Sequence, residues 1–338
     1  MSFFFVIKHF LARFSTKATP KERGTTLNRR ASLYLNDAAS TRIPYDDLWC
    51  SAVRCKLVHT RHTDLHTLWE VSNSGNVVPE IYPSMDEAYI AELKGVSRPH
   101  CFKTQYKDPN VGIDIYAWHS RDAIYMTIHM EPESEASVMK KQAKLCRIFN
   151  NVSVNSFFYK RLLSVIAHVI SYLEDFKDKR HTLVVSGYSL GGIMAHIASA
   201  VFGMMFPNLY VKCHTFGSPK PGNDDFASWF LRCVNENYRI TNGKDPIVYF
   251  PINYRWCHVE RTTIHFDKNL RISISYQHTP WYRRFFLSRG ILRTIVKKDY
   301  NRYDHDFDAY ISRLWHYMRL TSYLYTVPEA DTIEQSPI

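Results

Sequence analysis

The chain has 338 residues, of which 45% are hydrophobic and 22% are charged, a composition typical of globular proteins. No apolar run approaches the ~18–20 residues that a membrane-crossing helix needs, so no transmembrane span is expected. The net charge of +11 suits nucleic acid, anionic lipid or an acidic partner, and charge alone does not choose among them.

The cysteine pattern also excludes some kinds of site. The seven cysteines are odd in number and widely scattered, and no pair has Cys-x-x-Cys spacing. A zinc site or a dense disulfide framework is therefore not expected. We expect reduced, partly buried thiols and favour an intracellular location.

Residues 1–32 form a basic N-terminal segment. The first 21 residues contain no acid and carry basic side chains such as Lys8 and Arg13 among Phe and Leu. The apolar run at 3–7 is shorter than the ~7–15 residues of a secretory signal. A transit segment for an organelle, a helix on a membrane surface and a disordered tail remain open.

Residues 33–110 have a mainly helical pattern. Helical spacing runs from 45 to 93 and is interrupted by the turn-rich residues 72–76. Strands are then expected at 112–119 and 123–130, joined in a hairpin by a short polar turn.

Residues 131–153 show an ordered change of charge. The acids Glu131, Glu133 and Glu135 precede a group of bases between 140 and 147, which is the order that a helix dipole favours. A surface helix is expected here, and in the family resemblance described below this stretch corresponds to a lid.

The following segments alternate between helix and strand patterns. From residue 157 the apolar residues recur at i+3 and i+4, which predicts an amphipathic helix capped by Asn155 or Ser156. The alternation predicts an α/β domain with a mostly parallel central sheet and helices on both faces. The further expected elements are strands at 181–185, 210–216, 238–241, 262–267 and 270–276, and helices at 191–200 and 224–234, before a flexible tail at 327–338.

Residues 184–196 read VVSGYSLGGIMAH and place Gly-x-Ser-x-Gly where a strand becomes a helix. A serine on such a tight turn holds its hydroxyl above the sheet, the arrangement of a nucleophile elbow. A glycine-rich turn without chemistry is the alternative. Ser189 is therefore a candidate nucleophile.

A serine needs a base that takes its proton and an acid that orients the base. In a parallel α/β sheet the expected chain order is Ser, then Asp or Glu, then His. Asp245 fits the acid position because it follows a strand and precedes Pro246, although an aspartate before proline is also an ordinary turn residue.

The base must come from the histidines after Asp245. His265 alternates within a strand pattern, His278 precedes a helix start, and His316 lies deep in the terminal helix, so His258 and His305 remain. His305 precedes the last helix and is surrounded by aspartates at 304, 306 and 308. These acids would raise its basicity, or they are ordinary acids of a first helical turn.

Five stretches in order resemble those of class 3 (fungal-type) triacylglycerol lipases, which have the α/β-hydrolase fold. The resemblance spans roughly residues 110–315. The stretches are VNSFFYKRL at 154–162, SGYSLGG at 186–192, with Tyr188 where the family usually has histidine, TFGSPKPGN at 215–223, NGKDPIVYFP at 242–251 and HDFDAY at 305–310.

The resemblance implies a hydrolase core at 110–326 in which Ser189 is the nucleophile, Asp245 the acid and His305 the base. It also accounts for His258, since family members carry a histidine near a glutamate after the catalytic acid that is not the base. No metal and no cofactor are implied.

The sequence departs from the family where the oxyanion donors are expected. Leu190 would supply the first backbone N–H, and the second should follow the strand at 123–130. The family usually has a turn of the Phe-Arg-Gly-Thr type there, whereas this chain has no glycine. Met130 is the expected second donor, with Glu131 as the alternative if the alignment slips by one residue.

Residues 277–302 form a basic-aromatic insertion, in which Trp281 and Phe285 alternate with arginines such as Arg283 and Arg289. Such a segment suits a lipid interface. Stacking on single-stranded nucleic acid and a packed helix with a solvated basic face are the alternatives.

We therefore expect a serine esterase or lipase that hydrolyses acylglycerol or phospholipid esters through an acyl-enzyme, with peripheral contact to a lipid surface. A catalytically weak or inactive hydrolase-fold protein that binds lipid or a partner is the first alternative. A nucleic-acid-binding protein is the second, and no nucleic-acid module is recognisable. Retention of all three triad residue types in the right order argues against both.

Overall fold

The computed structural model describes residues 43–61, 63–74, 85–104, 112–130, 144–177, 181–259, 261–267, 272–275 and 302–326. The expected basic segment at 1–32, residues 277–301 of the insertion predicted at 277–302, and the tail at 327–338 lie outside these residues, as do Glu131 and His278.

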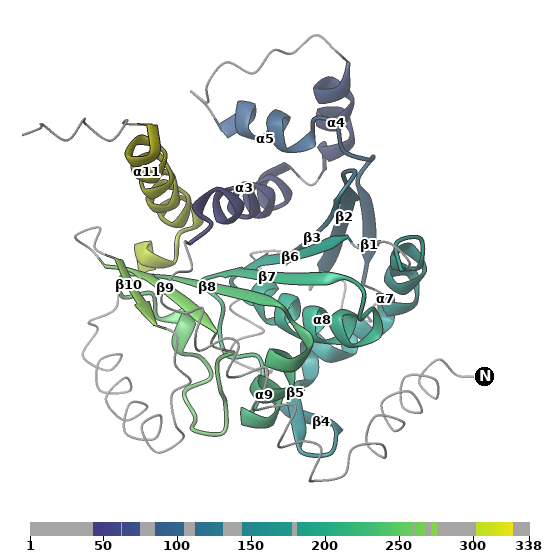
Figure 1. Cartoon of the computed structure of the whole chain (residues 1–338). Helices are drawn as coiled ribbons and strands as arrows, with labels where there is room; N and C mark the ends of the chain where they lie inside the picture. The colour runs from purple at the N-terminus through teal and green to yellow at the C-terminus, as the bar shows by residue number, and fades with distance from the viewer. Residues whose placement is uncertain are drawn as a thin grey trace, which may run out of the picture.

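The described residues form an eight-stranded sheet in the order β1-β2-β3-β6-β7-β8-β9-β10 (Figure 1). The central pairs from β3 to β9 are parallel, whereas β1–β2, β2–β3 and β9–β10 are antiparallel. The strands are β1 (His100–Lys103), β2 (Ile113–His119), β3 (Ala123–Met130), β6 (Thr182–Tyr188), β7 (Tyr210–Phe216), β8 (Glu236–Asn242), β9 (Thr262–Phe266) and β10 (Ile272–Ser275).

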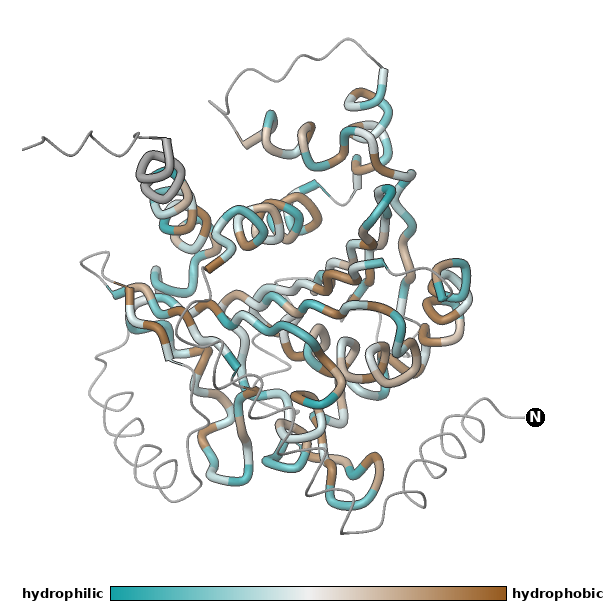
Figure 2. Tube along the Cα trace, viewed as in Figure 1, coloured by the Kyte–Doolittle hydropathy of each residue, from teal (hydrophilic) through white to brown (hydrophobic). Residues whose placement is uncertain are grey.

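Helices cover both faces of this sheet, as expected from the sequence (Figure 1). One face carries α7 (Ser156–Glu174), α8 (Leu190–Met205) and α9 (Asp224–Cys233). The other carries α3 (Tyr45–Arg61) and α11 (Phe307–Thr326), and α5 (Met85–Leu93) packs against α3 and against α4 (Leu65–Asn73). Each face has its own hydrophobic cluster. In Figure 2, hydrophobic residues recur along the central strands and along α3.

Helix α8 lies close to the sheet because its inward positions are small. Gly, Ala and Ser alternate with larger apolar residues, and every residue from Leu190 to Phe202 is buried. The β-branched residues of β6 are buried on both sides of the strand, which is typical of a central parallel strand.

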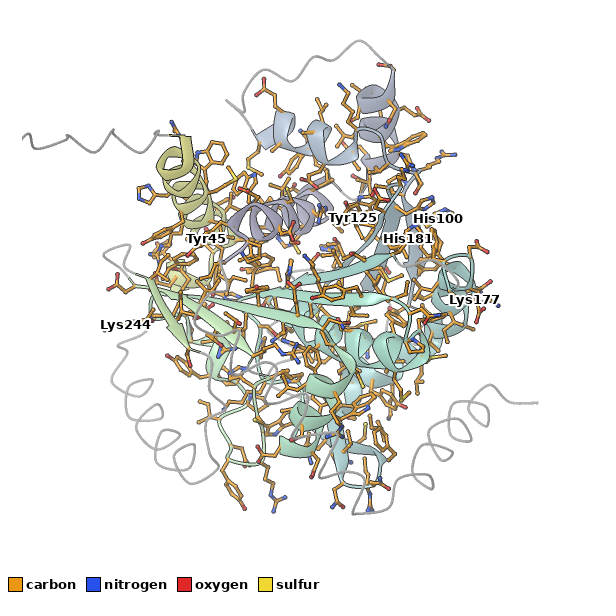
Figure 3. All side chains as sticks on the ribbon, in the orientation of Figure 1. Tyr45, His100, Tyr125, Lys177, His181 and Lys244 are labelled. Carbon is orange, nitrogen blue, oxygen red and sulfur yellow. The ribbon has the colours of Figure 1, made fainter. Side chains whose placement is uncertain are left out.

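The opposite face, under α3, contains polar pairs as well as apolar contacts. Ser51 Oγ lies 2.8 Å from His214 Nδ1, so α3 is joined to β7 by a buried hydrogen bond. The Arg54 guanidinium pairs with Glu92 at 2.7 Å and lies 3.9 Å from the ring centroid of Tyr125. Tyr125, labelled in Figure 3, lies on β3 beside α3. These contacts satisfy polar groups that burial would otherwise leave unpaired.

The predicted hairpin at 112–119 and 123–130 is confirmed as β2 and β3. The predicted helix from 157 is confirmed as α7, and its cap is Asn155, whose side chain accepts a hydrogen bond from the Phe157 N–H at 3.0 Å. The prediction missed β1, a short edge strand.

The expectation of a surface helix or lid at 131–153 is wrong for its second part, and residues 131–143 lie outside the described residues. β4 (Leu145–Phe149) and β5 (Val152–Asn155) form a two-stranded hairpin there. Asn150 turns the chain with φ 43°, and Val154 forms a bridge with Gly222. Charge order is a weak helix signal, and the alternating apolar residues of β4 and β5 determine the structure.

None of the seven cysteines, all of which lie in the described ranges, forms a disulfide. Within the described ranges, no helix combines the length and apolarity that a bilayer crossing requires. No group of three or more His, Cys, Asp or Glu side chains in the same ranges could hold a metal ion.

The buried histidines make stability depend on pH. Burial is the main cause that lowers the pKa of His196 and of His214 from 6.5 to about 3. Between these values the unfolded chain binds protons that the native protein does not, so the free energy of unfolding falls as the pH falls through this window. From pH 7 to pH 5, each histidine is expected to cost about 2 kcal/mol.

Urea unfolding of His196→Leu at both pH values should therefore show a smaller acid-induced loss than wild type. His168 is exposed on α7, and His168→Leu should keep the wild-type pH dependence. Equal acid sensitivity of His196→Leu and wild type would contradict the prediction.

Candidate active site

Ser189 lies alone between the end of β6 and the start of α8. Its φ of 51° and ψ of −125° are unusual for a residue with a side chain, and such strained positions cluster at functional sites. The backbone is held there by a hydrogen bond of 2.9 Å from the Ser189 N–H to the Phe216 carbonyl of β7. The local geometry is that of the expected strand-to-helix elbow.

The structure brings Ser189, His305 and Asp245 together from three parts of the chain. Ser189 Oγ lies 2.9 Å from His305 Nε2, and His305 Nδ1 lies 2.8 Å from Asp245 Oδ2. Asp245 follows β8, and His305 ends a short 3-10 helix, η2 (Arg302–His305), before α11. Both distances are within the range for proton transfer and orientation between side chains.

The Asp245 carboxylate is completely buried and well satisfied. Besides His305, Oδ2 accepts a hydrogen bond of 2.6 Å from the Tyr310 hydroxyl of α11. Oδ1 accepts one of 2.8 Å from the Ile247 N–H. Burial, and then the charge of Asp245, raise the pKa of Tyr310 well above its ordinary value, so this hydroxyl stays protonated and donates.

The other histidines occupy different places. His258 is buried, and its burial, followed by the charges of Arg239 and Lys220, lowers its pKa well below the ordinary value. His265 lies in β9 with its Nδ1 3.0 Å from Thr241 Oγ1, and His316 lies in α11. The ring hydrogen-bonded to Ser189 Oγ is that of His305.

The two expected oxyanion donors lie at the same end of the sheet. Leu190 is the first residue of α8, where backbone N–H groups have no partner within the helix. Met130 is the last residue of β3, two positions beyond Ile128. The Ile128 carbonyl oxygen lies so close to α8 that a Cβ built on Gly191 would be 2.5 Å from it, so the end of β3 lies beside the elbow.

Sequence reasoning gave no role to Gly217, Tyr310 or the side chain of Tyr188. Gly217 has φ +60°, and a Cβ there would lie 3.1 Å from Asp245 Oδ2 and 3.2 Å from His305 Cε1. Its place directly after a strand, in the stretch TFGSP, was the available signal. Nothing in the sequence alone indicated that the Tyr310 hydroxyl reaches Asp245.

Comparison with known proteins shows what this region resembles. The family model described as Lipase (class 3) matches residues 120–254, which include Ser189 and Asp245. This match covers less than half of the chain, and residues 120–254 form a region similar to class 3 lipases.

Two curated relatives match parts of the chain. The secreted mono- and diacylglycerol lipase 1 of Fusarium solani is 34% identical over 113 residues, 32% of this chain and 32% of the relative. The secreted mono- and diacylglycerol lipase MDL2 of Malassezia globosa is 25% identical over 118 residues, 31% of this chain and 39% of the relative. The match thus spans only about a third of the length of these relatives.

Solved structures extend the likeness from the class 3 lipase region to most of the fold. A lipase from Rhizopus microsporus var. chinensis aligns with a TM-score of 0.55 and 14% identity over 79% of this chain and 87% of that chain. A propeptide complex of the Rhizomucor miehei lipase aligns with a TM-score of 0.57 and 13% identity over 80% of each chain. The fold is the α/β-hydrolase fold expected from the sequence.

Gly217 offers a test of how tightly the class 3 lipase region packs around the three side chains. Gly217→Ala should lose about 1–2 kcal/mol from the positive φ alone, and its methyl group must also displace Asp245 or His305. Gly95→Ala is the matched control, because Gly95 has φ +71° with nothing within 4 Å of a built Cβ.

Both variants should lose stability in thermal unfolding. Only Gly217→Ala should also lengthen the Ser189–His305–Asp245 contacts in a crystal structure. Unchanged contacts in Gly217→Ala would show that the site has more room than the structure indicates.

Proposed function

We propose that this protein is a serine ester hydrolase that cleaves acylglycerol or phospholipid esters through an acyl-enzyme, with Ser189, His305 and Asp245 as its catalytic triad. The observation that carries the proposal is the continuous hydrogen-bonded chain from Ser189 Oγ through the His305 ring to Asp245 Oδ2. The class 3 lipase match supports the same reaction.

In the first step Ser189 Oγ attacks the ester carbonyl while His305 Nε2 takes the hydroxyl proton. Asp245 holds the Nδ1–H tautomer of His305 and stabilises the imidazolium that forms. The tetrahedral intermediate collapses, His305 returns the proton to the leaving alcohol, and an acyl-serine remains. Water then attacks the acyl-serine with His305 again as base, and the fatty acid leaves.

The charge that develops on the carbonyl oxygen needs donors that are already in place. We assign this role to the backbone N–H groups of Leu190 and Met130. The N-terminus of α8 supports the assignment, because a helix dipole favours negative charge at that end. The α8 helix is long enough for this effect, with 16 residues.

The substrate class is supported by the curated relatives, both of which are described as mono- and diacylglycerol lipases. We therefore place acylglycerols ahead of phospholipids. Both relatives are also described as secreted, which favours secretion over the intracellular location expected from the sequence. Contact with a lipid surface remains part of the proposal, since the expected basic-aromatic insertion lies outside the described residues.

The proposal is tested by labelling with a fluorophosphonate probe in wild type and Ser189→Ala. Wild type should label and the variant should not, because only an activated serine reacts with the phosphorus. Ser189 is completely buried in this structure, so the assay should run with and without emulsified lipid.

Hydrolysis of monoacylglycerol, diacylglycerol, triacylglycerol and phospholipid emulsions then identifies the substrate class. A folded wild-type protein that does not label under either condition would leave lipid or partner binding without turnover as the better account.

Tyr310→Phe should lower kcat about 10-fold or more with KM unchanged, because the Asp245 charge loses a hydrogen-bond donor while the ring keeps its packing. Tyr210→Phe is the control, since the Tyr210 hydroxyl donates to Glu236 at the far end of β7. Equal kcat values for Tyr310→Phe and wild type would show that Asp245 does not need this donor.

A further inference from the structure

In the described part of the chain, His305 belongs to a short turn and not to a long helix or a strand. His305 is the last residue of the short η2 turn, and α11 begins only at Phe307. A histidine ring that accepts a proton from Ser189 must be positioned to within a fraction of an ångström, so other contacts have to hold this turn.

Asp304, the residue before His305, is joined to the loop that carries the acid. Its Oδ2 accepts a hydrogen bond of 2.8 Å from the Lys244 N–H, next to Asp245. Its own carbonyl accepts one of 3.0 Å from the Asn242 side-chain amide. Asp304 is 8% exposed, so these bonds form with little competition from water.

The acid loop is shaped to receive this carboxylate. Gly243 lies between the two donors with φ +46°, and a Cβ on Gly243 would collide with the Asp304 carboxylate group. The Gly243 N–H donates to the Phe266 carbonyl of β9 at 2.6 Å, which fixes the loop on the sheet. The absence of a side chain at 243 is therefore what lets Asp304 reach Lys244.

Tyr188 holds the same turn from the side of the nucleophile. Its hydroxyl donates to the His305 carbonyl. Its ring is stacked on the His305 ring at 5.2 Å and on the Phe307 ring at 4.2 Å between centroids. Tyr188 is also directly adjacent to Ser189 in the chain, so it connects the nucleophile to the segment that carries the base.

We propose that Asp304 and Tyr188 are positioning residues that clamp the His305 turn between the Asp245 loop and the Ser189 elbow. This inference rests on the proposed function, because it assigns these residues to the placement of the catalytic base. Neither side chain touches the reacting atoms: each acts through His305.

A general effect of negative charge near His305 would give a different pattern. Asp308 is on the same segment, but its side chain is 67% exposed and pairs with Lys56 at 2.8 Å. Asp306 accepts a hydrogen bond from the Asp308 N–H within its own turn. If the charge alone mattered, removal of any of these acids would have a similar effect, whereas only Asp304 among these acids belongs to the clamp.

The first experiment compares Asp304→Ala, Asp304→Asn and Asp308→Ala. Asp304→Ala should lower kcat and the rate of fluorophosphonate labelling about 10- to 100-fold with KM nearly unchanged. Asp304→Asn should keep most of the rate because its amide oxygen can still accept from Lys244. Asp308→Ala should resemble wild type. Equal losses in Asp304→Ala and Asp308→Ala would overturn the clamp in favour of a charge effect.

A double-mutant cycle with Gly243→Ala tests the contact itself. Gly243→Ala should displace the Asp304 carboxylate and lower kcat as Asp304→Ala does. The double variant should be no slower than the slower single variant, because both changes break one contact. Independent, multiplying losses would show that Gly243 and Asp304 act separately.

Tyr188→Phe separates the hydroxyl from the ring. It keeps the stacking on His305 and loses only the hydrogen bond, so kcat should fall about 2- to 10-fold. Tyr210→Phe again serves as the control. An unchanged kcat would remove Tyr188 from the clamp.

A crystal structure of the Asp304→Ala variant tests the clamp without a measurement of turnover. In Asp304→Ala the Ser189 Oγ–His305 Nε2 distance should exceed its wild-type value of 2.9 Å, whether or not the proposed substrate is correct. A wild type that fails to label would contradict the proposed function, whereas an unmoved His305 in Asp304→Ala would contradict the clamp.

Discussion

A carboxylate without solvent exposure is the constraint on which this structure depends. Asp245 is completely buried, and an ionised group in that position must be compensated by donors. The donors come from separate parts of the chain: the N–H of Ile247, the ring of His305 and the hydroxyl of Tyr310. Because two of these lie at or in α11, the last helix must pack against the end of the sheet. It does so beside α3, so helices from distant parts of the sequence lie together over one face (Figure 1).

The helices on the two faces of the sheet are held by different kinds of contact. Under α8 the contacts are apolar, and small residues allow the helix to lie close to the strands. Under α3 the interface includes polar contacts, such as the buried hydrogen bond between Ser51 and His214 and the Arg54 guanidinium over the Tyr125 ring. Apolar contacts tolerate small shifts, whereas buried hydrogen bonds hold only in one register. The polar pairs therefore fix α3, and through α3 they fix the helix that follows His305.

The sequence predicted most of the sheet because its signals there are local. The β-branched run of β6 indicates a buried strand, and the apolar spacing of α7 indicates a helix with one buried face. Each signal lies within the element that it predicts. The hairpin of β4 and β5 was missed because charge order was preferred to a short alternating pattern.

The candidate site, like the fold, was predicted where the signals are local and missed where they are not. Chain order and motif spacing predicted Ser189 and Asp245 as nucleophile and acid and left His258 and His305 as candidate bases, and the family resemblance favoured His305. The structure brings Ser189, Asp245 and His305 together, and their catalytic roles are part of the proposal. The contacts of Gly217, Asp304 and Tyr310 join residues distant in sequence, and a single sequence contains no signal for such pairs.

The order of the three side chains along the chain also sets the order in which the site can form. Asp245 precedes His305 by 60 residues, and Ser189 precedes it by 116. At ~5–20 residues added per second, a ribosome needs roughly 3–12 s to cross the shorter interval. During this time a nascent chain carries Ser189 and Asp245 without His305. The proposed ester cleavage therefore has to wait until His305 has been made and α11 has docked on α3.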